Sequence, residues 1–307
     1  MTTRTPTPAN AGVLTAVTLT PDLSVSLLPP PPGVTDDPAD RDPGYASAHL
    51  QRGPTLVYRG VDLAEEGVGF GVPIVKLGRR TVFAGGADLI DIGTERSEDG
   101  GPVVELAYRL DREEGALLFA NGRRHRDAPS GLAGARDRLA LAHREHPAVR
   151  PLVDGLNAAL RRVFSAQTSY RPVPPVGVIR VRYSFSDAGR SMEVHAALDR
   201  LDDPKVTEIV LMNELGAHHF TRYHDSDGTT LDGPAIGSWG EIAAQEAALS
   251  DPVRGLSFAV TRAPGARLFR GRELAPGRLA WAGFAHVILP GVQTFTYRVV
   301  FGSTRDE

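Results

Sequence analysis

The sequence contains no cysteine, and this absence removes several classes of mechanism. Without cysteine there is no disulfide framework, no thiolate metal site and no thiol nucleophile. A chain of 307 residues can nevertheless bury a sizeable core, as one large β domain or two ordinary ones. We therefore expect folding to need neither a disulfide nor a metal, and we predict no cofactor.

Lysine is almost absent as well. Lys76 and Lys205 are the only lysines among 34 basic residues, which leaves 32 arginines. Together with abundant Ala, Gly and Pro, this bias indicates a GC-rich, bacterial type of genome rather than a binding surface. The 37 acidic residues are mixed with the basic ones, the net charge is -3, and no run of five or six like charges occurs. This composition predicts that nucleic acid is not a partner.

Long apolar stretches are also missing. No segment approaches the roughly 18 consecutive apolar residues that a membrane helix needs. Residues 1–10 are rich in Thr and Pro and do not lead into the apolar core of a secretory signal. We therefore expect no membrane partner and a cytoplasmic location.

Short apolar runs divided by Gly- and Pro-rich turns recur through most of the chain. Such regular spacing is typical of a β-sandwich or barrel, and alternation of apolar and polar residues in 179–185 indicates a strand with one buried face. The predicted fold class is mainly β, a large antiparallel β-sandwich. Strands are expected at 13–20, 23–28, 55–61, 70–77, 81–84, 103–110, 116–120, 179–185, 192–198, 206–212, 256–261, 267–270, 279–289 and 294–301.

One region, residues 130–164, has a helical pattern instead. Ser130 is placed to cap an Ala- and Leu-rich helix that ends near Pro147. Apolar residues then recur at three- and four-residue spacing from Val149 to Val163. The sequence therefore predicts a helical hairpin inserted in the sandwich, and a further turn of helix near 241–249.

Proline-rich stretches suggest how the chain is divided. Residues 29–32 are four consecutive prolines, followed by Asp, Pro and Gly, which favours an extended connector. We interpret residues 1–54 as an N-terminal segment with early strands and this connector. Residues 55–307 are interpreted as a single β-sandwich domain with the helical insertion at 130–164.

The segment 213–228 gathers the residue types of an acid–base site. It holds three of the nine histidines together with carboxylates, an arginine and a tyrosine, and it starts where the strand expected at 206–212 ends. Carbohydrate chemistry uses a carboxylate with a second acid or base, aromatic faces and arginine. The candidate catalytic residues are Glu214, His218, His219 and Asp225, and the candidate substrate-binding residues are Arg222, Tyr223, His224, Trp239, Arg270 and Trp281.

The predicted mechanism uses no metal. His218 or His219 exchanges a proton with a substrate oxygen, and Glu214, or else Asp225, plays the opposite role. Arg222 is expected to orient the substrate and Tyr223 to donate a hydrogen bond. In an extended chain the side chains of His218 and His219 point to opposite sides, so at most one of them is expected to face a given pocket.

Other interpretations of the same residues stay open. His219 and His224 with Glu214 or Asp225 are the ligand types of a zinc or iron site, although no metal-binding signature is present. Residues 225–232 resemble part of a calcium loop, for which an Asp-Gly turn is the simpler explanation. A third interpretation is a non-catalytic sandwich that binds carbohydrate or assembles with its own copies, so a homo-oligomer is left open.

With strands on both sides of this His/Glu/Arg/Tyr segment, the chain resembles the large β-sandwiches of the galactose-mutarotase and polysaccharide-lyase type. The resemblance covers roughly residues 55–301 and concerns length, strand density and residue types, without a diagnostic motif. The helical hairpin departs from the usual pattern. The resemblance implies a small sugar or an oligosaccharide as ligand, and His with Glu or Asp as the acid–base pair. Sandwiches host many functions, so this implication is an analogy.

Overall fold

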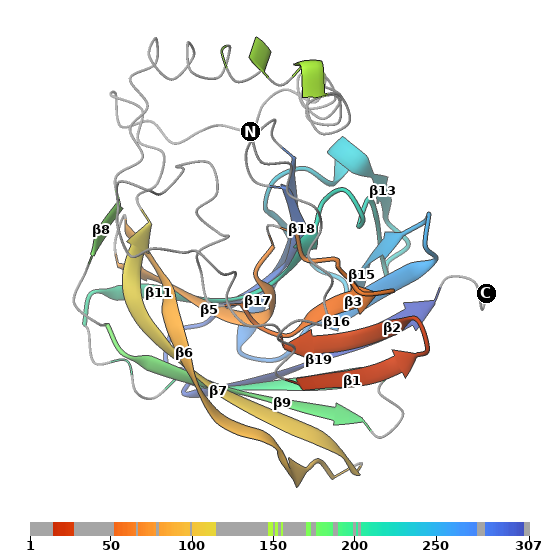
Figure 1. Cartoon of the computed structure of the whole chain (residues 1–307). Coiled ribbons are helices and arrows are strands. Elements are labelled where there is room, and N and C mark those ends of the chain that lie inside the picture. The colour runs from red at the N-terminus through yellow and green to blue at the C-terminus, as the bar shows by residue number, and fades with distance from the viewer. Residues whose placement is uncertain are drawn as a thin grey trace.

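The computed structural model describes residues 15–27, 52–65, 67–77, 80–98, 100–114, 147–149, 151–152, 155, 170–172, 176–186, 190–198, 201, 204–274 and 280–303. These residues are mainly β and form two antiparallel sheets (Figure 1). No helix within these ranges has the length and apolar character needed to cross a membrane. The predicted fold class is therefore confirmed as mainly β.

The smaller sheet has four strands, β1 (Thr15–Thr20), β2 (Leu23–Leu27), β3 (Thr55–Tyr58) and β4 (Val61–Asp62), in sequence order. β1 and β2 are the two early strands that the sequence predicts. Arg59 and Gly60 join β3 to β4 with φ angles of 49° and 77°, the two positive values that a tight two-residue hairpin turn requires. Since β3 pairs with β2, this sheet includes residues on both sides of the predicted division at 54/55.

The larger sheet has 15 strands, and all of its pairs are antiparallel. Their order is β13-β12-β15-β16-β19-β10-β9-β7-β6-β5-β11-β18-β17-β14, with β8 on β7. The strands are β5 (Gly69–Leu77), β6 (Arg80–Arg96), β7 (Gly100–Glu114), β8 (Tyr170–Pro172), β9 (Val178–Ser186), β10 (Ser191–Ala197), β11 (Val206–Gly216), β12 (Arg222–Asp225), β13 (Thr230–Asp232), β14 (Gly240–Ile242), β15 (Glu246–Asp251), β16 (Leu256–Thr261), β17 (Ala266–Leu274), β18 (Ala280–Ile288) and β19 (Thr294–Ser303).

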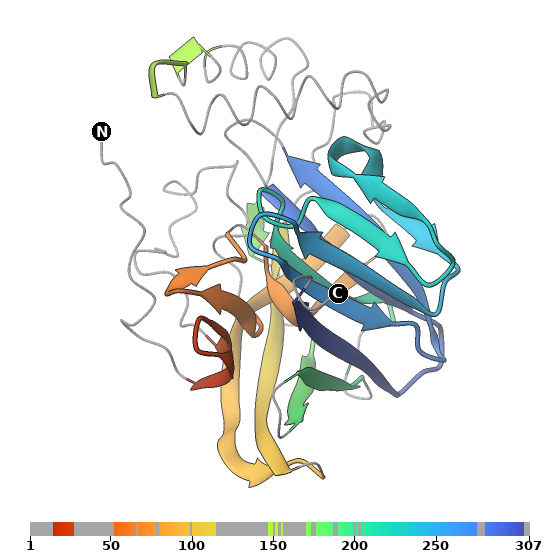
Figure 2. The ribbon, with the colours of Figure 1, turned by 90° about the vertical axis from the view of Figure 1, so that its right-hand side faces the viewer.

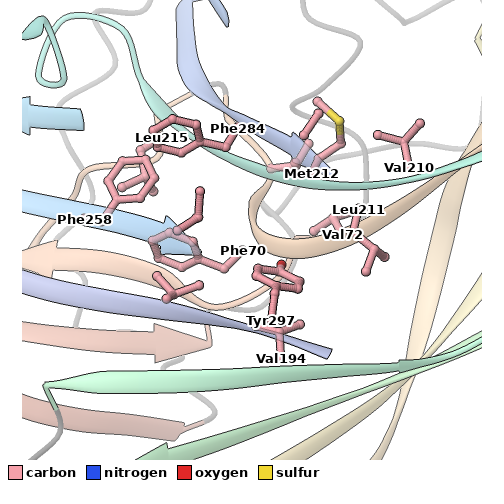
Figure 3. Packing of buried hydrophobic residues seen from close by; sticks show 14 of the residues in the cluster. Phe70, Val72, Val194, Val210, Leu211, Met212, Leu215, Phe258, Phe284 and Tyr297 are labelled. Atoms are coloured by element: carbon pink, nitrogen blue, oxygen red, sulfur yellow. The ribbon is translucent and has the colours of Figure 1, made fainter. Parts of the chain in front are cut away.

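Two groups of strands in this sheet face each other across an aromatic core. Phe70 of β5 and Phe284 of β18 contact Phe258 of β16 edge to face, with ring centroids 5.3 and 5.6 Å apart. Tyr297 of β19 lies with its ring centroid 4.1 Å from that of His286 on β18. Figure 3 shows several of these side chains in the space between the strands. Each aromatic pair contributes about 0.5–1.5 kcal/mol beyond the burial of its area, and together they hold β5 and β18 against β16 and β19.

The two groups are connected through the long strands β6 and β7. These strands have 17 and 15 residues and pair along most of their length. Figure 2 shows their hairpin extending well beyond the C-terminal strands. The shorter strands predicted at 81–84 and 103–110 are parts of this hairpin.

Strand β11 positions the candidate site, because its two faces meet different surroundings. Side chains alternate along a strand, and Figure 3 shows Met212 on one side of β11 and Leu211 on the other. Asn213 faces the core, where its Oδ1 accepts the hydroxyl of Tyr297 at 2.6 Å. Glu214 therefore shares a face with Met212, which we call the outer face of β11.

The predicted helical hairpin falls almost entirely outside the described residues. Within 130–164 the structure describes a single 3-10 turn, η3 (Pro147–Val149), and helical backbone at residues 151–152 and 155. The described part of the chain thus does not support a helical hairpin. The strand expected at 116–120 also lies outside the described residues.

The helical turn expected near 241–249 is wrong. Residues 240–242 and 246–251 are the strands β14 and β15. Ala247 and Leu249 are buried, and β15 pairs on both sides, with β12 and β16. Alanine is the strongest helix former, but helix propensity is a weak preference, and strand pairing of this kind outweighs it.

Candidate functional site

The chain turns directly after β11, and this turn brings the two neighbouring histidines together. The N–H groups of His219 and Phe220 both donate to the carbonyl of Gly216, at 3.0 and 3.1 Å. The expectation of an extended chain, with His218 and His219 on opposite sides, is therefore wrong. Both imidazoles reach the same carboxylate, that of Glu65.

Glu65 lies between β4 and β5 and was not among the residues that the sequence singles out. Nδ1 of His218 is 2.8 Å from its Oε2, and Nε2 of His219 is 3.2 Å from its Oε1. Burial of this carboxyl favours its neutral form, but the hydrogen bonds from His218 and His219 outweigh burial and hold the pKa of Glu65 well below its usual range. Glu65 is thus an anion with an imidazole at each oxygen.

The surroundings of Glu65 hold its backbone in an unusual conformation. Its φ is 51°, in the left-handed region that costs a non-glycine residue about 1–3 kcal/mol. Arg52 donates to the carbonyl oxygen of Glu65 and forms an ion pair with Asp62 at 2.7 Å. The side chain of Glu65 lies over Gly216, where a Cβ would come within 2.7 Å of Oε2. Strained positions of this kind cluster at functional sites.

His219 has a second neighbour on its other side. Its Nδ1 lies 3.0 Å from Nη1 of Arg254, and the same Nη1 donates to Oδ2 of Asp251 at 2.6 Å. Asp251 and Arg254 belong to the turn that joins β15 to β16, and the other oxygen of Asp251 accepts two backbone N–H groups of that turn. A continuous series of contacts therefore runs from Asp251 through Arg254, His219 and Glu65 to His218.

The register of β11 and β18 places Glu214 and Trp281 beside this group. Glu214 and Gly216 are two residues apart and share the outer face of β11. Trp281 is directly opposite Gly216, and Gly283 is directly opposite Glu214. Because directly opposite residues share a face of the sheet, Trp281 and Glu214 flank the position over Gly216 that the Glu65 side chain fills.

The two tryptophans of the chain stack on each other at the same face. The rings of Trp239 and Trp281 are 4.7 Å apart and inclined by 16°. Gly271 of β17 leaves the room for them, since a Cβ there would lie 2.9 Å from Trp239 and 3.1 Å from Trp281. Trp281 is buried and Trp239 is 38% exposed. We name the outer-face cluster as Glu65, Glu214, His218, His219, Trp239 and Trp281.

Three other predicted residues form a separate contact. The hydroxyl of Tyr223 donates to Oδ2 of Asp225 at 2.7 Å, and the guanidinium of Arg270 lies over the Tyr223 ring at 5.1 Å. Burial, followed by the bond to Asp225, raises the pKa of Tyr223. Oδ1 of Asp225 accepts the N–H groups of Asp227 and Thr229, at 3.1 and 2.9 Å. The Asp225 carboxylate thus shapes the turn between β12 and β13.

The remaining two predicted residues, Arg222 and His224, are exposed on β12. They lie on either side of the buried Tyr223 along the strand and therefore on the opposite face from it. Arg222 forms an ion pair with Asp232 at 2.8 Å. The structure thus brings Glu214, His218, His219, Trp239 and Trp281 to one face and distributes Arg222, Tyr223, His224, Asp225 and Arg270 elsewhere.

Neither predicted metal arrangement forms among the residues that the structure describes. No three His, Asp or Glu side chains there are grouped to hold an ion. Both ring nitrogens of His219 face other side chains, Glu65 and Arg254, which leaves neither for a metal. In the calcium-like segment the N–H of Gly228 donates to the carbonyl of Asp225 at 3.0 Å. This is the Asp-Gly turn that was the simpler explanation.

Comparisons with known proteins give a resemblance in fold only. No protein-family model and no curated protein matches the chain. The Slr1438 protein from Synechocystis sp. PCC 6803 is 11% identical over 99% of this chain and 100% of its own, with a TM-score of 0.39. A galactose mutarotase-like protein from Lactobacillus casei ATCC 334 is 8% identical over 94% of this chain and 98% of its own, with a TM-score of 0.35. HI1317 is 8% identical over the same shares, with a TM-score of 0.32. The resemblance is weak.

Proposed function

We propose that the protein carries out metal-independent acid–base chemistry on a carbohydrate at the outer-face cluster. The observation that carries this proposal is the 2.8 Å hydrogen bond between Nδ1 of His218 and the Glu65 carboxylate. A carboxylate at one nitrogen of an imidazole orients the ring and leaves the other nitrogen to exchange a proton. His218 is accordingly the proton-transfer residue, and Glu65 is the group that orients it.

The second nitrogen of His218 is available for this role. For its Nε2 the described residues provide no hydrogen-bond partner. The side chain of His218 is 14% exposed, so part of it is open to solvent.

Glu214 takes the opposite role in the proposal. It is a buried carboxyl residue on the same face of β11 as the position that Glu65 covers. Delivery of a proton to a sugar oxygen, with removal of a proton from water, from a ring carbon or from a hydroxyl, is common to hydrolysis, elimination and epimerisation. The exposed indole of Trp239 supports a carbohydrate as the substrate, because the apolar face of a sugar ring packs on an aromatic ring.

The test is turnover of reducing sugars and oligosaccharides by the full-length protein. Exchange between the anomeric NMR signals of the two anomers would detect epimerisation at the anomeric carbon. Release of reducing ends from oligosaccharides would detect cleavage. We expect turnover of one sugar class, and a fall of about 100-fold or more in His218→Gln, the size that removal of a general acid or base produces. Arg59→Met is the control, because Arg59 forms an exposed ion pair with Asp22 on the small sheet. No turnover of any sugar, or full turnover by folded His218→Gln, would refute the proposal.

The Trp239 and Trp281 stack favours a second candidate, a carbohydrate-binding module without catalysis. An exposed indole supported by a buried one is a rigid platform for a sugar ring. In that case Trp239→Ala abolishes sugar binding in calorimetry, Trp239→Phe retains much of it, and Glu65→Gln leaves the affinity unchanged. Catalysis predicts instead that Glu65→Gln impairs turnover while sugar is still bound.

A further inference from the structure

The contact between Arg254 and His219 determines where the hydrogens of His219 lie. A guanidinium only donates hydrogen bonds. Nη1 of Arg254 carries two hydrogens, one of which is donated to Asp251 at 2.6 Å, and the same nitrogen lies 3.0 Å from Nδ1 of His219. Nδ1 of His219 must therefore accept, and an accepting ring nitrogen bears no hydrogen.

The other nitrogen of His219 then carries its single hydrogen. Nε2 faces Oε1 of Glu65 at 3.2 Å, and a carboxylate accepts. His219 is thus a neutral imidazole that donates to Glu65 and accepts from Arg254. A proton added at Nδ1 of His219 would face the N–H of Arg254 Nη1, which is 3.0 Å away. Two donors would then meet where there is now a donor and an acceptor.

Asp251 fixes the guanidinium that imposes this state. The side chain of Asp251 is only 1% exposed. One of its oxygens accepts from Arg254, and the other accepts the backbone N–H groups of Val253 and Arg254, at 3.0 and 3.1 Å. The short turn between β15 and β16 and this carboxylate together hold Nη1 against His219.

We infer that Arg254, oriented by Asp251, is a positioning residue that locks His219 as the neutral tautomer with its hydrogen on Nε2. Its catalytic meaning rests on the proposed function: with His219 locked, His218 is the one imidazole of the pair that exchanges a proton. Without the lock, two imidazoles would compete for protons at a single carboxylate, and the protonation state of the site would be divided between them. The tautomer itself follows from the contacts alone.

The inference is tested on the full-length protein by two-bond nitrogen–proton NMR of the histidine rings near neutral pH. This spectrum separates the two tautomers and the imidazolium by their nitrogen shifts. We expect His219 to show a protonated Nε2 and an unprotonated Nδ1. Arg254→Met should remove this signature, while Arg254→Lys, which retains a charged donor, should restore much of it. Arg59→Met, which removes an exposed arginine elsewhere, should change nothing.

The outcomes of this experiment separate the lock from the proposed function. A hydrogen on Nδ1 of His219 in the wild type overturns the inference. This test needs no variant, so it can be made even if Arg254→Met does not fold. An unchanged His219 spectrum in folded Arg254→Met overturns it as well. Absence of turnover with every sugar refutes the proposed function. The NMR result then still decides whether Arg254 holds His219 in the neutral tautomer.

Discussion

The carboxylate of Glu65 occupies the space over Gly216 that any larger residue there would need. A Cβ at residue 216 would lie 2.7 Å from Oε2 and 2.8 Å from Cγ of Glu65. The same two segments are joined by the N–H of Gly216, which donates to the carbonyl of Leu63 at 2.8 Å. The chain leaving the small sheet is thus fixed to the end of β11 at the point where the turn to His218 begins.

Gly216→Ala should therefore displace Glu65 and destabilise the protein. Overpacking of a filled site costs about 1–3 kcal/mol, and the shift should also separate Glu65 from His218 and lower any turnover. Urea unfolding of the single and double variants is the measurement. In the background of Glu65→Ala the methyl group finds empty space, so the cost of Gly216→Ala should shrink towards zero. An equal cost in both backgrounds would show that Glu65 is not what the methyl group meets.

The stabilising effect of Glu65 should depend on pH in a definite direction. Its pKa in the folded protein is lowered below the ordinary value of 4.5. The unfolded state then binds more protons as pH falls, so the contribution is fully present above about pH 4.5 and is lost as pH falls through the folded pKa. His218 and His219 face this carboxylate, and Arg254 lies behind His219.

The variant Glu65→Gln has no carboxyl group to titrate at this position, so its melting temperature is the reference for that of the wild type. The difference in melting temperature between wild type and Glu65→Gln should be greatest near neutral pH and should narrow in acid. Melting curves recorded from about pH 3 to pH 8 would measure it. A difference that stays constant over this range would mean that the charge of Glu65 contributes nothing to stability.

Much of the fold can be predicted from local pattern, and the site only in part. The alternating residues 179–185 fall within β9, where every second side chain is buried, because alternation directly records which face of a strand meets the core. His218 and His219 stand out by composition. Glu65, by contrast, is 153 residues from His218 in sequence, and Arg254 is 35 residues from His219. Only the pairing of distant strands brings them together, and no local pattern records that pairing.

The turn after β11 shows the same limit at short range. The strand expected at 206–212 continues as β11 to Gly216, which the residue types do not indicate. Treating the chain beyond it as extended gave opposite directions for His218 and His219. The stop is imposed by contacts from elsewhere, namely the Leu63 carbonyl that takes the Gly216 N–H and the core that takes Phe220. The helical turn expected near 241–249 is wrong for a similar reason, because the neighbours β12 and β16 decide the conformation of β15.

The buried His286 should give the protein a second pH dependence. Burial lowers the pKa of His286 from 6.5 to about 4, although its hydrogen bond with the Thr261 carbonyl opposes the change. The unfolded state therefore binds more protons between about pH 4 and 6.5, and stability is lost as pH falls through this window. At about 1.4 kcal/mol per pKa unit, the whole effect is on the order of 3 kcal/mol.

Replacement of His286 by phenylalanine should remove this loss, because Phe cannot be protonated and suits the neighbouring rings of Phe295 and Tyr297. The free energy of unfolding measured across the window should become flatter in His286→Phe. His195 is the matched control, since it lies on the surface-facing side of β10 with Nδ1 2.8 Å from the Thr296 hydroxyl. If His195→Gln flattens the curve as much as His286→Phe, the assignment to His286 is wrong.

Asp225 is the predicted catalytic residue whose surroundings argue most directly for another role. Its two oxygens accept the Tyr223 hydroxyl and the N–H groups of Asp227 and Thr229, so the carboxylate is used within its own hairpin. Asp225→Ala removes both accepting oxygens, so the Tyr223 hydroxyl and the two N–H groups of the turn lose their partner. Loss of such a bond costs about 1–3 kcal/mol, so we expect a lower melting temperature with turnover per folded molecule retained. Tyr223→Phe removes only the hydroxyl and should show a smaller loss in the same assays.

A fall in turnover of about 100-fold, the size expected for a lost acid or base, with unchanged melting would instead return Asp225 to the chemistry. It would also move the site from the outer face of β11 to the β12 hairpin.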